Sequence, residues 1–143
     1  MRILGLLLAG LVAGFLTFQS APASANVIAK IDISQQRMRV YVNGQHKYTW
    51  KVSTGRRGYG TPTGSYSVKR MHRTYYSRKY GGAAMPNSLF FRGGFAVHGT
   101  SYVSQLGRPA SHGCVRLHPS NARTLFNLVR AHGAGSSRIV LTY

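Results

Sequence analysis

Hydrophobic and polar residues alternate through the first part of the chain that follows its leading apolar run. Residues 27–34 alternate with a period of two, and so do residues 37–42. This period is typical of a strand with one face in the core and one in water. Asn43-Gly44 is a strong hairpin signal, after which residues 47–52 are expected to return as a strand. The pattern predicts a three-stranded meander.

The middle of the chain is less regular. Residues 54–64 predict a glycine-rich loop, and residues 65–70 a short strand. Residues 72–85 are basic and aromatic, which favours an irregular excursion at the rim of a site. Strand character returns at residues 88–98, where Gly93-Gly94 interrupts it, and a polar loop follows up to residue 110.

Only residues 119–132 have a helical pattern. Pro119 suits a first helical position. Four apolar residues follow at the i, i+3, i+4, i+7 spacing of a buried helix face: Ala122, Leu125, Phe126 and Val129. Gly133 ends the helix, and residues 138–143 predict a last strand. The whole pattern predicts a mainly β fold with one packed α-helix near the C-terminus.

Residues 1–25 have the pattern of a signal peptide. Arg2 precedes an apolar run over residues 3–18, and Ala23-Ser24-Ala25 has the small-x-small form of a cleavage site. A retained membrane anchor is the alternative, but the apolar run is shorter than the ~20 residues of a spanning helix. We expect residues 26–143 to be exported to the periplasm or cell wall, with no stable membrane anchor after cleavage.

The chain is strongly basic, with 19 Lys and Arg against one acid, Asp32, and a formal net charge of +18. Cleavage after Ala25 removes Arg2 and leaves +17, from 18 basic residues and one acid. A charge of this size favours an anionic partner. For an exported chain we expect an envelope polymer and no nucleic acid. A generally solvating basic surface is the alternative.

The single cysteine, Cys114, lies in Ser111-His112-Gly113-Cys114, beside a glycine that allows close approach of a substrate. A thiol nucleophile needs a nearby base, and His98, at the end of an apolar strand, is the expected one. The only carboxylate, Asp32, lies in the first predicted strand. The group that orients His98 is therefore expected to be neutral, a backbone carbonyl or a Ser, Thr or Asn side chain.

These residues resemble the L,D-transpeptidase catalytic domain, the YkuD family of bacterial cell-wall enzymes. The resemblance rests on His98-Gly99-Thr100 and on Ser111-His112-Gly113-Cys114-Val115-Arg116-Leu117, with twelve residues between His98 and Ser111. Three weaker matches occur in the same order along the chain as in the family: residues 31–36, Val52-Ser53-Thr54-Gly55 and Thr61-Pro62-Thr63-Gly64. The resemblance covers residues 26–143 and implies an L,D-transpeptidase-type β-sandwich.

The resemblance also implies a two-step acyl transfer on peptidoglycan stem peptides. Cys114 would attack the diaminopimelate–D-Ala bond of a tetrapeptide stem, and an amine would take the thioester. That amine would belong to another stem, giving a 3→3 cross-link, or to an envelope protein. His98 would be the base, with its other nitrogen on the Gly99 carbonyl. The N–H groups of His112, Gly113 and Cys114 would form the oxyanion hole. No metal and no cofactor is expected.

Arg116, Ser111 and Thr100 are the expected substrate-binding residues. Arg116 would either meet a substrate carboxylate or brace its loop, and His112 remains open between a catalytic and a structural role. Imidazole and abundant positive charge also favour a partly ionised Cys114 at neutral pH.

Other functions fit parts of the pattern. An L,D-carboxypeptidase would pass the acyl group to water, and a basic envelope-binding module would leave the Cys114 motif without a purpose. Sortases have a longer Cys-to-Arg spacing, and papain-like peptidases place cysteine before histidine. A zinc site of His112, Cys114 and His118 has the spacing of no common site, and His118 is expected instead to begin the helix.

Overall fold

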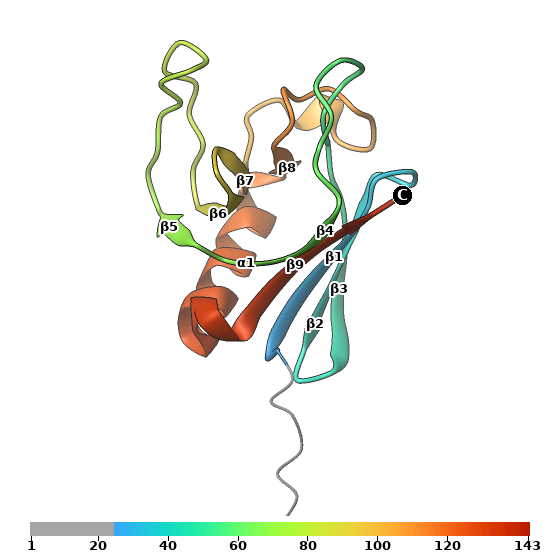
Figure 1. Ribbon diagram of the computed structural model, residues 1–143, viewed down its shortest axis with the longest axis vertical. Helices are drawn as coiled ribbons and strands as arrows, with labels where there is room; N and C mark the ends of the chain where they lie inside the picture. The colour runs from blue at the N-terminus through green and yellow to red at the C-terminus, as the bar shows by residue number, and fades with distance from the viewer. Residues whose placement is uncertain (1–24) are drawn as a thin grey trace, which may run out of the picture.

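The computed structural model describes residues 25–143, so the expected signal peptide lies outside the described residues except for Ala25. Two sheets pack with one helix, α1 (Pro119–His132) (Figure 1). The strands are β1 (Val27–Asp32), β2 (Arg37–Val42), β3 (Gln45–Lys51), β4 (Gly64–Ser67), β5 (Arg70–His72), β6 (Ser88–Arg92), β7 (Phe95–Gly99), β8 (Val115–Leu117) and β9 (Ser137–Thr142).

The five-stranded sheet has the order β3-β2-β1-β9-β4. The predicted meander forms its first three strands, which are antiparallel. Asn43 and Gly44 make the turn between β2 and β3, with φ angles of 49° and 79° that suit these residues. β9 adds to β1 in parallel, and β4 adds to β9 in antiparallel orientation. Residues on one face of β1 are buried, whereas Lys30 on the other face is exposed.

The four-stranded sheet has the order β5-β6-β7-β8. The prediction of one strand over residues 65–70 is wrong, because the chain crosses from one sheet to the other there. Gly64–Ser67 pairs with β9, buried Val68 makes the crossing, and the Lys69 amide already donates to Phe90 O at 2.8 Å. β8 was not predicted. It pairs in parallel with β7 and sets His98 opposite Arg116.

The helix has the predicted bounds. His118 caps it, since its Nδ1 accepts from the Ser120 amide at 3.2 Å. Gly133 ends it with a φ of 96°, and its amide donates to Val129 O at 2.8 Å. The buried helix face joins one core cluster with the inner residues of both sheets. The prediction of a mainly β fold with one packed helix near the C-terminus is confirmed.

Within residues 25–143, no helix is long and apolar enough to cross a membrane.

Candidate active site

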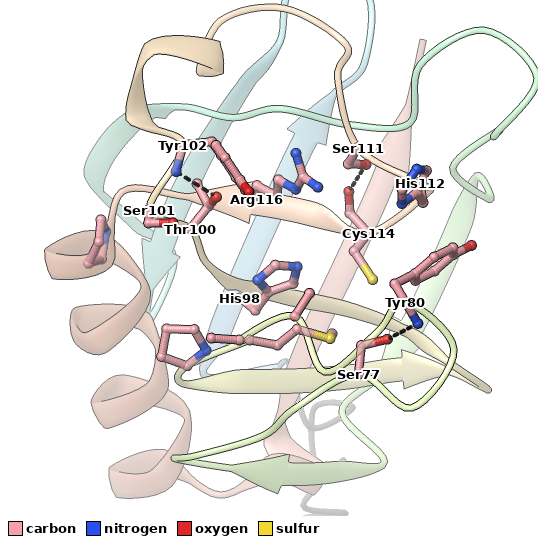
Figure 2. Close-up of a pocket in the computed structure, with 15 residues that line it drawn as sticks. Ser77, Tyr80, His98, Thr100, Ser101, Tyr102, Ser111, His112, Cys114 and Arg116 are labelled. Atoms are coloured by element: carbon pink, nitrogen blue, oxygen red, sulfur yellow. Dashed lines mark hydrogen bonds between the residues drawn. The ribbon is translucent and has the colours of Figure 1, made fainter.

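A pocket of about 490 Å³ lies where three loop segments meet (Figure 2). Its walls come from residues 77–86, which include the second half of the basic and aromatic excursion, from residues 98–102 and from residues 111–116. Pro119 lies at one side. Six predicted site residues line this pocket: His98, Thr100, Ser111, His112, Cys114 and Arg116. The structure therefore brings the two halves of the sequence motif together in one cavity.

His98 lies at the end of β7 and is only 6% exposed. Its Nδ1 is 2.7 Å from the carbonyl oxygen of Gly99. A carbonyl only accepts hydrogen bonds, so Nδ1 carries the proton and Nε2 keeps a free lone pair. Burial lowers the pKa of His98 from 6.5 to about 4, against the opposing effect of the Gly99 bond. The imidazole is therefore neutral at neutral pH and can accept a proton at Nε2.

Cys114 is half-buried, with its thiol 3.7 Å from the carbonyl oxygen of Gly94. Burial raises the pKa of this thiol, and it outweighs the lowering effects of the Ala96 backbone and of Arg116. The expectation of a partly ionised thiol is therefore wrong for the resting protein. Positive charge is abundant, but desolvation of the sulfur opposes the thiolate more strongly. The resting pair is a neutral thiol and a neutral imidazole.

The turn that carries the cysteine is fixed by Ser111, which is 1% exposed. Its hydroxyl donates to Cys114 O at 2.6 Å and accepts from the Gly113 amide at 3.0 Å. The Gly113 amide is thus already engaged, which favours the amides of His112 and Cys114 as oxyanion donors. The contacts also favour positioning of the nucleophile by Ser111 over the substrate binding that the sequence predicted.

Gly113 is required at its position for two reasons. Its φ of 121° lies in a region that side-chain-bearing residues rarely adopt. An added Cβ would also lie 2.7 Å from Cε1 of Phe95. A methyl group here would push the turn that carries Cys114 away from Phe95 of β7.

Thr61 joins the glycine-rich loop to this turn. Its hydroxyl accepts from the Gly55 amide at 2.8 Å and donates to Gly113 O at 2.7 Å. Thr61 is 7% exposed, so both bonds are shielded from water. The weak sequence motif that begins at Thr61 thus has a specific task, because it holds the backbone on the other side of Cys114.

Residues 26–140 match the model of the L,D-transpeptidase catalytic domain, YkuD. The chain belongs to this family. The L,D-transpeptidase from Mycobacterium smegmatis is similar in structure, with a TM-score of 0.73 and 22% identity over 83% of this chain and 59% of that one. The L,D-transpeptidase from Stackebrandtia nassauensis has a TM-score of 0.73 and 25% identity, over 92% of this chain and 62% of that one. The L,D-transpeptidase from Xylanimonas cellulosilytica has a TM-score of 0.71 and 27% identity, over 85% of this chain and 63% of that one.

The chain thus spans about three fifths of the length of these solved L,D-transpeptidase structures. A comparison with curated protein sequences finds no match. The family assignment therefore rests on the domain model, and the solved structures add the shared fold.

Arg116 is half-buried on β8. Its Nη1 donates to Gln105 Oε1 at 3.0 Å, and its guanidinium lies over the ring of Tyr102 at 5.7 Å. Arg116 therefore braces the loop after β7 while it also faces the pocket. Thr100 is buried, and its Oγ1 accepts from the Tyr102 amide at 3.1 Å, so this predicted substrate residue shapes the same loop.

His112 lies in an aromatic stack that the sequence did not predict. Tyr80 stacks on its ring with centroids 4.3 Å apart, and Tyr59 contacts it at 4.8 Å. Arg56 and Lys79 lie over the outer rings of this stack. Partial burial and then Arg56 lower the pKa of His112. Three loops meet in the stack, and no local spacing relates residues so far apart in the chain.

The zinc interpretation has no support among residues 25–143, where no three His, Cys, Asp or Glu side chains gather. His118 caps the helix, as predicted, and so is not placed with His112 and Cys114.

Proposed function

We propose that this chain is an exported peptidoglycan L,D-transpeptidase in which Cys114 is the nucleophile and His98 the base. The observation that carries the proposal is that a thiol and a neutral imidazole line the same pocket (Figure 2). The Gly99 carbonyl fixes the His98 tautomer, so that Nε2 is the nitrogen that can take the thiol proton. Membership of the family supports the reaction class.

In the first step, the sulfur of Cys114 attacks the diaminopimelate carbonyl while Nε2 of His98 takes the thiol proton. A C–S bond forms, and the carbonyl oxygen gains negative charge that the amides of His112 and Cys114 stabilise. The C–N bond to D-Ala then breaks, and His98 returns the proton to the leaving amine. The products are a thioester on Cys114 and free D-Ala.

In the second step, an acceptor amine attacks the thioester and His98 takes one of its protons. The C–S bond breaks, a new amide forms, and the proton returns to the sulfur. The resting thiol is neutral, so thiolate is made only as the attack proceeds. This order protects an exposed pocket from unspecific alkylation, because the thiolate and not the thiol is the strong nucleophile.

The donor is a tetrapeptide stem, whose terminal D-Ala carries a free carboxylate next to the bond that breaks. Arg116 is the cation two residues after Cys114; it lies on β8 and lines the same pocket. Its Nη1 donates to Gln105 Oε1 and to Ala110 O, which leaves Nη2 and Nε for that carboxylate. The acceptor is the amine of a second stem or of an envelope protein.

The location that fits this substrate is the periplasm or cell wall, after cleavage behind Ala25. The envelope polymer is the macromolecular partner, and neither a metal nor a cofactor takes part in the proposed steps.

The deciding experiment incubates residues 26–143 with purified tetrapeptide muropeptides and identifies the products by mass spectrometry. We expect cross-linked dimers and free D-Ala, and neither product with Cys114→Ala. Release of D-Ala without dimers would instead identify an L,D-carboxypeptidase. Activity that persists in Cys114→Ala would refute the proposal.

A second readout uses imipenem, since a similar LD transpeptidase, LdtMt1, has been solved in complex with it. Intact-protein mass should show one adduct that is absent in Cys114→Ala. If Arg116 binds the donor carboxylate, Arg116→Gln should lose the preference for free over amidated tetrapeptide. An unchanged preference would leave Arg116 as a brace of the loop.

A further inference from the structure

The outer face of the five-stranded sheet carries cations that the catalytic proposal does not use. Lys30 on β1 is directly opposite Arg39 on β2, and Arg37 on β2 is directly opposite Lys51 on β3. Like charges directly opposite each other destabilise a sheet. The chain has a single acid to offset them. Two such pairs side by side indicate that a group from outside the chain neutralises this face.

The single acid, Asp32, offsets these cations only in part, although Arg39 is among the groups that lower its pKa. Asp32 is in register with Arg37. Its Oδ1, however, accepts from Ser34 Oγ at 2.6 Å and from the Gln35 amide at 2.9 Å. These two bonds commit the carboxylate to the turn between β1 and β2. Only one of the four cations has an acid opposite it.

One end of this face is hollowed into a groove of about 280 Å³. Arg37 and Lys51 line it from the paired strands, and Arg108 lines it from the loop after β7. Leu106 and the turn glutamines make up most of the remaining wall, and no acid lines it. Three cations from two separate regions of the chain thus converge on one hollow.

Hydrogen bonds fix the backbone of the residues that line the groove. The Gly107 amide donates to Val52 O at 2.8 Å, and the Val52 amide donates to Gln36 O at 3.0 Å. Arg108 O accepts from Ser53 Oγ at 2.7 Å. Figure 1 shows the turn after β1 at the same end of the sheet as the loop after β7. The cations therefore project from backbone positions that are fixed before any ligand arrives.

We propose that this groove, with the adjoining Lys30 and Arg39, binds a linear anionic polymer that carries closely spaced phosphate groups. Cations on one face of a strand repeat at roughly 7 Å, and those on neighbouring strands at about 5 Å. A polymer with a phosphate on each short repeat can place one group in the groove and the next on the sheet. Stem carboxylates, which are separated by whole disaccharides, match this spacing less well.

The same face is poorly suited to a lipid bilayer. The aromatic ring on this face, Tyr41, is half-buried and has Lys30 over it at 5.0 Å. Exposed Tyr48 is in register with buried Val40 and so belongs to the opposite face. Amphipathic surfaces that enter a bilayer present large apolar side chains between their cations. A flat cationic face with a hollow at its end suits a polyanion chain better.

The test measures binding of inorganic polyphosphate in the Cys114→Ala background, so that its outcome is independent of the catalytic proposal. We expect Arg37→Gln/Lys51→Gln/Arg108→Gln to weaken binding on the order of ten- to a hundredfold at low salt. The slope of log K against log salt should fall by about two to three. The matched control, Arg92→Gln/Arg123→Gln/Arg130→Gln, removes the same charge from exposed positions on β6 and α1. Its affinity should stay within about threefold of the parent.

Equal losses of polyphosphate affinity in the two triple variants would overturn the proposal, because binding would then depend on net charge alone. Tighter binding to anionic phospholipid vesicles or to peptidoglycan than to polyphosphate would also overturn it. Circular dichroism checks that each variant is folded. If the triple variant of the groove unfolds, the single variant Arg108→Gln replaces it in the test. Arg108 is an exposed loop residue, so this substitution should leave the fold intact and still weaken polyphosphate binding about threefold.

Discussion

The two sheets of this molecule place the same kind of strand in different surroundings. The five-stranded sheet has one face in the core and one in water, and its outer face carries opposed cations. The four-stranded sheet is covered on both faces. Leu89 and Phe91 point into the main core, whereas Phe90 and Ala96 belong to a smaller cluster with Met85 of the excursion.

This difference in covering accounts for the chemistry of the site. His98 follows Ala96 by two residues on β7 and so shares the face that the excursion covers. Because water is excluded there, the pKa of His98 is lowered. An imidazole on the outer face of the other sheet would not undergo this desolvation. The covered sheet thus keeps the imidazole neutral, and the open sheet presents charge to the surroundings.

The largest expected effect is on packing. Phe91 is fully buried on β6 and contacts Tyr66 with ring centroids 5.4 Å apart. Phe91→Ala should lower the free energy of unfolding by about 3–5 kcal/mol through lost burial and the cavity left behind. Tyr41→Ala removes a ring from the outer face and should cost about 1 kcal/mol or less. Urea titration of both variants measures the contrast, and equal losses would contradict the difference between the sheets.

The next effect is the pH dependence of stability. The folded pKa of His98 is about 4 and the ordinary value 6.5, so the unfolded chain binds more protons between them. Stability from this residue is complete above about pH 6.5 and is lost as the pH falls towards 4. The loss is on the order of 3 kcal/mol.

Chemical unfolding at several pH values checks this, with His98→Gln as the control that cannot titrate. The control should show a flatter profile between pH 4 and 7. A profile as steep as that of the parent would mean that another group causes the loss. The lowered pKa of Asp32 acts in the same direction but only below about pH 4.

A smaller effect is expected at the loop beside the nucleophile. A Cβ on Gly55 would lie 1.6 Å from Tyr59 O and 3.2 Å from Cα of Gly113. Gly55→Ala should therefore shift the loop, cost about 1–3 kcal/mol and slow acylation by imipenem. Gly135→Ala is the control, since nothing lies within 4 Å of its added Cβ. Equal acylation rates in the two variants would show that the loop adapts without moving Cys114.

The smallest expected effect is a gain in stability. Arg39→Glu places an acid opposite Lys30 in the register of β1 and β2. Removing a like-charge pair and making an opposite one should stabilise the protein by about 0.5 kcal/mol, and salt should reduce the gain. Thermal unfolding at two salt concentrations measures it. A loss of stability would mean that the outer face is not strained by its own charge.

The sequence predicted the open sheet better than the covered one, for a physical reason. A strand with one wet face alternates, and Arg37–Val42 could be placed to the residue. Leu89, Phe90 and Phe91 are buried without alternation, so the sequence shows a strand there but not what covers it. β8 is three residues long, and its partners are β7 and, through a single bridge, Ser53; no local period can indicate such distant pairing.

The chemistry divides in the same way. The resemblance to the family implied the contact of His98 with the Gly99 carbonyl, and the shortage of acids only agreed with it; the structure has this contact. The stacking of Tyr59 and Tyr80 on His112 depends on how three loops meet. The protonation state of Cys114 depends on burial, which the sequence does not contain, and the prediction from charge alone was wrong.

The parallel pairing of β1 with β9 also bears on how the chain reaches its native state. These strands lie near the two ends of the described chain and are neighbours in the middle of the sheet. Their union closes a loop of almost the whole domain, and such distant contacts slow folding. A chain delivered residue by residue, from a ribosome or through a translocation channel, cannot complete this sheet until Ser137–Thr142 has emerged. The last strand to arrive is therefore the one that locks the topology.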